Sequence, residues 1–454
     1  MKVKDILKVT NGKLLAGNEN IECENFSKDT RTINEGDIYI GIKGEKFDGS
    51  KLWDEALEKG AKAVIVENIE IEKDKLQKYA NKAIIKVENT LEALYKLAEY
   101  KRSLYDIPVI AITGSVGKTS TKDIIANVIS TKYKTLKTEG NNNNNIGLPM
   151  TILKLKDHEA LVVEMGMNHF GEISLLTKIA KPTIAVITNI GTSHIGNLGS
   201  RENILKAKLE ILEGMDKPIL VINNDNDLLH DWYEKNKEKI EIHTVGIENQ
   251  SEINAKEIKL KEESSEFTAK TKQEEIKVNV PVGGTHFVYN SLCAIAIGKL
   301  LDISTENIIK GISTFELTKK RMDIKKLDNG AIIINDSYNA SYESMKASIE
   351  FLAKHTGERK IAVLGDMFEL GEYTKELHEK VGKEIVKNKI DVLICSGEYS
   401  KYIIEKVKNS STKTFYYENK EQIVEKLQKE LKNGDVVLVK ASNAMKFYEI
   451  CQKL

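Results

Sequence analysis

The stretch IPVIAITGSVGKTSTKDIIANVIS, from Ile107 to Ser130, contains an apolar run, a glycine turn and a helical pattern in direct succession. The run VIAIT is short and almost continuously apolar, which is typical of a strand covered on both faces. Gly114 and Gly117 permit a tight turn, so that backbone N–H groups and the positive end of a helix starting near Lys118 face one point. The stretch predicts a phosphate-binding loop between a parallel strand and a helix.

This loop is shorter than the commonest phosphate loop, GxxxxGK[ST], which would place a glycine where the chain has Ile112. The shorter loop keeps the chemistry, because Lys118 can reach terminal phosphates and the Thr119 hydroxyl can ligate Mg²⁺. An ordinary glycine turn is the alternative, but the strand before, GKTS within and the helix after favour nucleotide binding. The loop residues predicted to bind ATP are Gly114, Ser115, Val116, Gly117, Lys118, Thr119 and Ser120.

Apolar runs alternate with helical patterns along most of the chain, which predicts an α/β protein. LVVEMGM, IAVITNI and PILVINN follow the loop, and a second series begins near Ala331. The segment from Ile240 to Val282 alternates apolar with charged residues and is expected to be antiparallel or edge structure. The predicted domains are a small N-terminal α/β domain (1–104), a central parallel-sheet domain with the phosphate loop (105–316) and a C-terminal doubly wound, Rossmann-like domain (317–454).

The composition narrows the classes of partner and location. The chain has 454 residues, 41% of them apolar, with 68 basic and 68 acidic residues, so nucleic acid and anionic membranes are not expected partners. Its four cysteines are scattered, which argues against a disulfide framework or a zinc site. The N-terminus lacks a leader pattern and no apolar run reaches about 18 residues. These features predict a soluble cytoplasmic protein.

Two polar residues follow strand-like runs in the central domain. Glu164 ends the run in VVEMGM, and His194 lies a few residues beyond IAVITNI. Ligands of open α/β sheets bind at the carboxyl ends of strands, so both residues are candidate Mg²⁺ ligands, although Mg²⁺ prefers oxygen. A salt-bridge glutamate and a loop histidine are the alternative interpretations, and neither residue decides between them by itself.

Further segments resemble the Mur ligases, the ATP-dependent amide-forming enzymes of peptidoglycan synthesis. The resemblance covers nearly the whole chain and keeps the family's order of motifs. Its segments are SKDTRTINEGDIYIGIKGEKFDG, TGSVGKTS, TEGNNNNNIGLPMTIL, EMGMNHFGEI, HIGNLGSRENILKAKLEI, DSYNASYESMKASIEFL and LGDMFELGEYTKELHEKVG. The resemblance implies a role for Lys208 that its spacing alone does not indicate. A lysine so placed is carbamylated in these enzymes and helps to hold Mg²⁺.

The resemblance implies a division of labour among the candidate residues. The implied catalytic residues are Lys118, Glu164, His194 and Lys208, and the implied Mg²⁺ ligands are Thr119, Glu164, His194 and the Lys208 carbamate. The implied further ATP contacts are Asn290, Arg321 and Asp336. The implied substrate contacts are Ser27, Asp29, Thr30 and Arg31 at the UDP-sugar end, and Asn144, Tyr338, Asn339 and Lys440 near the reacting groups.

The resemblance also implies the reaction. ATP would phosphorylate the carboxylate of UDP-N-acetylmuramoyl-tripeptide, and the amine of D-Ala-D-Ala would displace phosphate. A monomer is the family expectation. Two departures from the family's motifs are present. YNANP is YNASY here, with Ser341 and Tyr342, near the site for the incoming amine, and GxHN is GTHF, with Phe287. The third residue of the tripeptide, lysine or diaminopimelate, stays open, as does a variant dipeptide.

Three alternatives remain to be weighed. The ligase that adds the third amino acid carries a DNPR motif in its diaminopimelate-adding versions, and this chain has none. Folylpolyglutamate synthase and cyanophycin synthetase share the core fold, but the N-terminal UDP-type segment disfavours both. A catalytically silent nucleotide-binding paralogue is a different class. The presence of Lys118, Glu164, His194 and Lys208 argues against it, and ATP turnover distinguishes the two.

Overall fold

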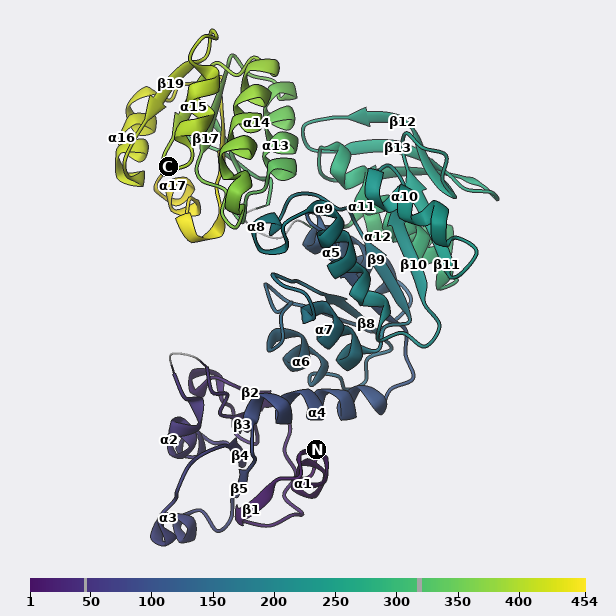
Figure 1. The fold of residues 1–454 in the computed structure, drawn as a ribbon, viewed down its shortest axis with the longest axis vertical. Coiled ribbons are helices and arrows are strands. Elements are labelled where there is room, and N and C mark those ends of the chain that lie inside the picture. Colours follow the sequence, from purple (N-terminus) through teal and green to yellow (C-terminus); the bar gives the residue numbers. More distant parts are fainter. Residues whose placement is uncertain (45–46, 317–320) are drawn as a thin grey trace.

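The computed structural model describes residues 1–44, 47–316 and 321–454, which form three sheets arranged along the molecule (Figure 1). The N-terminal and C-terminal sheets lie at opposite ends, with the largest sheet between them. The predicted α/β class with three sheet-based units is confirmed. The predicted boundary at residue 317 falls outside the described residues, so the domain limits remain a prediction. No helix within the described ranges is long and apolar enough to cross a membrane.

The N-terminal sheet has the order β1-β5-β4-β3-β2 and is parallel except for β1, which runs antiparallel to β5. Its strands are β1 (Lys13–Ala16), β2 (Phe26–Ser27), β3 (Ile38–Ile40), β4 (Ala63–Val66) and β5 (Ala83–Lys86), and its helices include α1 (Val3–Thr10), α2 (Trp53–Glu58) and α3 (Lys73–Lys78). The helix α4 (Thr90–Ser103) packs against α1 and also against α6 (Gly147–Ile152) and α7 (Glu172–Ala180) of the next unit. It therefore links the two units directly.

The central sheet has nine strands in the order β14-β13-β12-β11-β10-β9-β6-β8-β7. They are β6 (Val109–Thr113), β7 (Thr135–Lys137), β8 (Ala160–Glu164), β9 (Ile184–Ile187), β10 (Ile219–Asn223), β11 (Glu241–Gly246), β12 (Ile253–Leu260), β13 (Ser265–Lys270) and β14 (Glu275–Val280). The apolar runs predicted as parallel strands are β6, β8, β9 and β10, and all residues of the first three are buried. The helices α5 (Lys118–Ile129), α11 (Thr285–Leu300) and α12 (Thr305–Ser313) pack together beside them.

The prediction for 240–282 is partly wrong. β12 and β14 each pair antiparallel with β13, as expected, but β11 runs parallel to both β10 and β12. Helix α10 (Asp227–Asn236) lies between β10 and β11 and returns the chain to the starting edge, so β11 runs in the same direction as β10. Alternation of apolar and charged residues reports one exposed face of a strand, not its direction.

The C-terminal sheet has the order β15-β16-β20-β17-β18-β19 and is parallel except for β15. Its strands are β15 (Asp323–Lys326), β16 (Ile332–Asn335), β17 (Arg359–Leu364), β18 (Val392–Cys395), β19 (Lys413–Tyr416) and β20 (Asp435–Lys440). One face packs on α13 (Tyr342–Lys354), α14 (Thr374–Lys387) and α15 (Lys401–Val407), and the other on α16 (Lys420–Glu430) and α17 (Tyr448–Lys453). Helices on both faces confirm the predicted doubly wound unit.

Candidate active site

A cavity of about 690 Å³ lies between the central and C-terminal units. It is lined by residues that follow the carboxyl ends of β6, β8, β9, β16 and β20, the edge where open α/β sheets bind ligands. The predicted site residues that line it are Ser115, Val116, Gly117, Lys118, Thr119, Ser120, Asn144, Glu164, His194, Asn290, Arg321, Asp336, Tyr338, Asn339 and Lys440. The structure therefore brings together residues separated by more than three hundred positions in the chain.

The phosphate loop has the backbone that its glycines were expected to allow. Gly114 has φ +152°, and a Cβ there would lie 1.9 Å from the hydroxyl oxygen of Thr188, so no side chain fits. Gly117 has φ +83° and directly precedes α5. Lys118 follows at the first position of the helix and donates to the Gly114 carbonyl at 2.8 Å. Burial lowers the pKa of Lys118, while nearby Glu164 opposes that shift.

Two residues that the sequence analysis missed hold this loop in shape. Asn189 accepts from Ser115 N through its carbonyl (3.0 Å) and from Val116 N through Oδ1 (3.1 Å). Thr188 donates its hydroxyl to the Val116 carbonyl at 2.7 Å. Both follow β9 directly, so the rule that singled out Glu164, a polar residue at a strand's carboxyl end, could have found them.

Glu164 is the centre of a small oxygen-rich cluster. Its carboxylate accepts from the Thr119 hydroxyl and from the Asn143 side-chain amide, each at 2.8 Å, and the residue is 2% exposed. Asn143 was not predicted; its neighbour Asn144 was, and that side chain instead accepts from Ile146 N and Gly147 N at the start of α6. A run of five asparagines gives no signal for choosing between neighbours.

The donor types of this cluster fit a magnesium ion. Among the described residues, no three His, Cys, Asp or Glu side chains are grouped to hold a metal by themselves. Mg²⁺ does not need such a cage, because it is usually held by one or two carboxylates together with substrate phosphates and water. The Thr119 hydroxyl and the Glu164 carboxylate, side by side at the phosphate loop, supply oxygens of that kind.

Lys208 lies in α9 (Arg201–Leu209) and is 1% exposed, but it is not among the residues that line the cavity. Burial and the nearby Lys118 ammonium lower the pKa of Lys208 well below its ordinary value. This direction favours the neutral amine, which is the state that adds carbon dioxide to form a carbamate. The charged pattern of α9 predicts a solvated face and does not reveal this burial.

His194 precedes α8 (Ile195–Leu198) with φ +63°, a left-handed conformation that is uncommon outside glycine. Its Nδ1 lies against the carboxylate of Glu369, which comes from the C-terminal unit. His194 lowers the pKa of Glu369. The Glu369 carbonyl also accepts from Gly196 N at 3.0 Å, so the two units meet beside His194.

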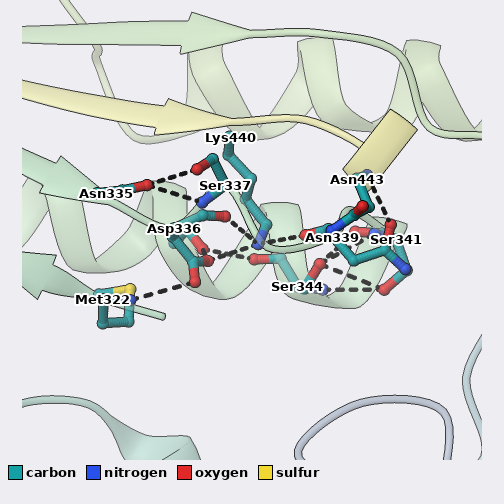
Figure 2. Close-up of polar contacts among 10 residues, drawn as sticks. Met322, Asn335, Asp336, Ser337, Asn339, Ser341, Ser344, Lys440 and Asn443 are labelled. Carbon is teal, nitrogen blue, oxygen red and sulfur yellow. Dashed lines mark hydrogen bonds and ion pairs between the residues drawn. The ribbon is translucent and has the colours of Figure 1, made fainter. Parts of the chain in front are cut away.

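The C-terminal wall of the cavity is built around a buried ion pair, as Figure 2 shows. Lys440 extends from β20 to the Asp336 carboxylate and also donates to the Asn339 carbonyl at 3.0 Å. Asp336 accepts further hydrogen bonds from Ser348 Oγ (2.7 Å) and Met322 N (3.3 Å). The pair fixes the segment that carries Asn339, so Lys440 has a clear structural role beside the predicted one.

Arg321 joins this wall to the phosphate loop. It donates to the Thr119 hydroxyl at 2.9 Å, and its guanidinium lies 4.0 Å from the centre of the Tyr338 ring, a cation–π contact. Asn290 accepts from the Thr121 hydroxyl at 2.9 Å, and its Nδ2 is buried with no hydrogen-bond partner among the described residues. Arg321 and Asn290 both line the cavity, and their contact with ATP remains a prediction.

The departures from the expected motifs have structural explanations. Ser341 caps α13 by accepting from Ser344 N, as an asparagine also does. Tyr342 occupies the first helical position, where proline is common, and does not line the cavity; its hydroxyl contacts Glu384 on α14. Phe287 is 1% exposed and packs 6.3 Å from Phe315, ring centre to ring centre.

The four residues predicted at the UDP-sugar end lie in the N-terminal unit, away from the cavity. They are tied to one another and to α2: Asp29 pairs with Arg31 at 2.6 Å, Ser27 Oγ donates to the Asp29 carbonyl, and Thr30 donates to Glu55. The segment is thus a pre-formed turn, and Arg31 is largely exposed.

A phosphate loop, adjacent oxygen ligands and a third unit closing one wall define a three-domain nucleotide-binding α/β protein. Family models match it over most of its length: "Mur ligase family, catalytic domain" at residues 24–102, "Mur ligase middle domain" at 112–298 and "Mur ligase, glutamate ligase domain" at 320–443. The UDP-N-acetylmuramoyl-tripeptide--D-alanyl-D-alanine ligase of Bacillus subtilis is 37% identical, covering 100% of this chain and 98% of the relative. The chain belongs to the Mur ligase family.

Solved structures agree. MurF from Acinetobacter baumannii matches with a TM-score of 0.89 at 28% identity, covering 100% of this chain and 98% of that one. MurF ligase from Thermotoga maritima in complex with ADP matches with a TM-score of 0.83 at 30% identity, covering 96% and 98%. The expected family and the three-domain fold are confirmed by these matches.

Proposed function

We propose that this protein is an ATP-dependent ligase that joins D-Ala-D-Ala to UDP-N-acetylmuramoyl-tripeptide, the step that completes the peptidoglycan pentapeptide precursor. One observation carries the proposal: Lys118, Thr119 and Glu164 share a cavity with Arg321 and the Asp336 region of the C-terminal unit. The ligase name of the Bacillus subtilis relative and the ADP bound to the Thermotoga maritima relative support the substrates and the nucleotide.

The chemistry proceeds in two steps. A carboxylate oxygen of the tripeptide attacks the γ-phosphorus of ATP, and ADP leaves with the bridging oxygen. The amine of the dipeptide then attacks the acyl phosphate carbon, the carbon–oxygen bond to phosphate breaks, and the amine loses a proton. Lys118 and Arg321 lie where they can neutralise charge on the transferred phosphoryl group. The C-terminal wall excludes water, which would otherwise hydrolyse the acyl phosphate.

Magnesium would be held by Thr119, Glu164, His194 and a carbamate on Lys208. When bound, it supplies positive charge to the phosphates. The depressed pKa of Lys208 supports the carbamate, and the contact between Thr119 and Glu164 supports a shared oxygen site. Ser27, Asp29, Thr30 and Arg31 would hold the UDP-sugar end, which leaves the peptide free to extend to the cavity.

Phosphate release tests the proposal. We would measure it with ATP and Mg²⁺ and with the two peptide substrates together or singly. Release that requires both substrates, and that falls by orders of magnitude in Lys118→Met, is the expected result. ATP turnover without either substrate, or none with both, would overturn it. We further propose a cytoplasmic monomer, because both peptide substrates and ATP are soluble; light scattering of the purified protein tests the monomer.

A further inference from the structure

We propose that Glu343 is a positioning residue that ties the C-terminal unit to the phosphate loop through the segment 191–193. This inference rests on the proposed function, because it assigns the tie a part in ligation. Glu343 lies in the first turn of α13, lines the cavity and touches the central unit.

The contact itself is well defined. The two carboxylate oxygens of Glu343 accept from the backbone N–H of Thr192 at 2.8 Å and from its hydroxyl at 3.0 Å. Thr192 is 9% exposed, so these hydrogen bonds compete little with water. A Cβ at Gly191 would lie 2.6 Å from the Glu343 carboxyl carbon, so a side chain there would displace the carboxylate from this position.

The same segment, residues 191–193, also hydrogen-bonds to the phosphate loop. Gly191 N donates to Ser115 Oγ at 2.8 Å, and Ser193 Oγ donates to the Ser115 carbonyl at 3.2 Å. Glu343 therefore reaches Ser115 through the residues on either side of Thr192. A change in the position of α13 is transmitted to the loop that holds the phosphates.

The tie has a specific consequence for kinetics. Glu343 hydrogen-bonds to Thr192 and reaches the phosphate loop only through its neighbours, so we expect the affinity for ADP to be preserved without it. The alignment of the loop with groups from the C-terminal unit should be lost, and with it the rate of phosphoryl transfer. Losing hydrogen bonds to a charged group of this kind should lower kcat about tenfold or more.

The experiment compares Glu343→Gln and Thr192→Val with the double variant. The control is Glu350→Gln, the same change two turns further along α13. We expect kcat to fall about tenfold in each single variant, no further in the double variant, and about twofold or less in the control. The dissociation constant of ADP, from calorimetry, should change by about twofold or less, and unfolding temperatures should match.

Hydrogen exchange provides a readout that does not depend on ligation. The Thr192 amide should exchange at least about tenfold faster in Glu343→Gln than in the wild type or in Glu350→Gln. Unchanged exchange, additive losses in the double variant, or an equal loss in Glu350→Gln would overturn the inference. If the wild type fails to ligate but the Thr192 amide still exchanges faster in Glu343→Gln, the proposed function is rejected and the contact between Glu343 and Thr192 stands. If both single variants ligate normally, the part of Glu343 in ligation is rejected.

Discussion

The buried pair of Lys440 and Asp336 predicts a loss of stability that depends on pH. Their side chains are 3% and 14% exposed, so neither charge is well hydrated. Asp336→Asn keeps the shape but removes the charge that compensates Lys440. Breaking such a pair from one side costs about 3–5 kcal/mol, and the lower value applies here because Lys440 keeps the carbonyls of Asp336 and Asn339 as acceptors.

The sign of the pH dependence follows from the same surroundings. Burial lowers the pKa of Lys440, and the Asp336 carboxylate opposes that shift. In Asp336→Asn the pKa of Lys440 in the folded state therefore falls further below its unfolded value of 10.5. Between these two values the unfolded chain binds more protons than the folded chain, so stability of the variant rises with pH. The deficit should be largest at neutral pH and shrink as pH approaches the unfolded value.

Differential scanning calorimetry measures this deficit. About 3 kcal/mol corresponds to a fall of roughly 6–12 °C in the unfolding temperature of a domain of this size at pH 7. The control is Glu376→Gln, which breaks an exposed pair with Lys380 in the same unit and should cost about 0.5 kcal/mol or less. The reasoning is refuted if Asp336→Asn loses no more than the control, or if its deficit is the same at pH 7 and near pH 9.5.

Three further predictions concern the cavity. Gly114→Ala places a Cβ against Thr188 at a positive φ and should weaken ADP binding at least about tenfold by calorimetry; unaltered affinity would contradict the steric argument. Lys208→Met removes the amine that would carry the proposed carbamate and should lower kcat at least about 100-fold in the phosphate-release assay, with ADP affinity within about threefold; a smaller loss in kcat counts against metal support by Lys208. Tyr342→Pro keeps the helix start and does not reach the cavity, so the KM for D-Ala-D-Ala should stay within about twofold; a large shift would show that this position contacts the dipeptide.

The sequence predicted those parts of the candidate site whose residues are close together in the chain. The loop from Gly114 to Ser120 carries its own turn, lysine and helix start, and the structure has that arrangement. Glu164 was found because it ends a strand-like run. Glu343 and Thr192 were not, because these two partners lie 151 positions apart in the chain. What they bind is decided by the packing of the units.

The sequence by itself determined which segments become strands and helices and the order of the three sheets along the chain. Apolar periodicity and glycine positions determine these features because they act on neighbouring residues. Tertiary structure alone decided the direction of β11, the burial of Lys208 behind a charged helical pattern and the meeting of Arg321 with Thr119. Each of these depends on which surfaces pack together. That choice is made by the burial of whole faces across distant parts of the chain, which no single stretch of sequence specifies.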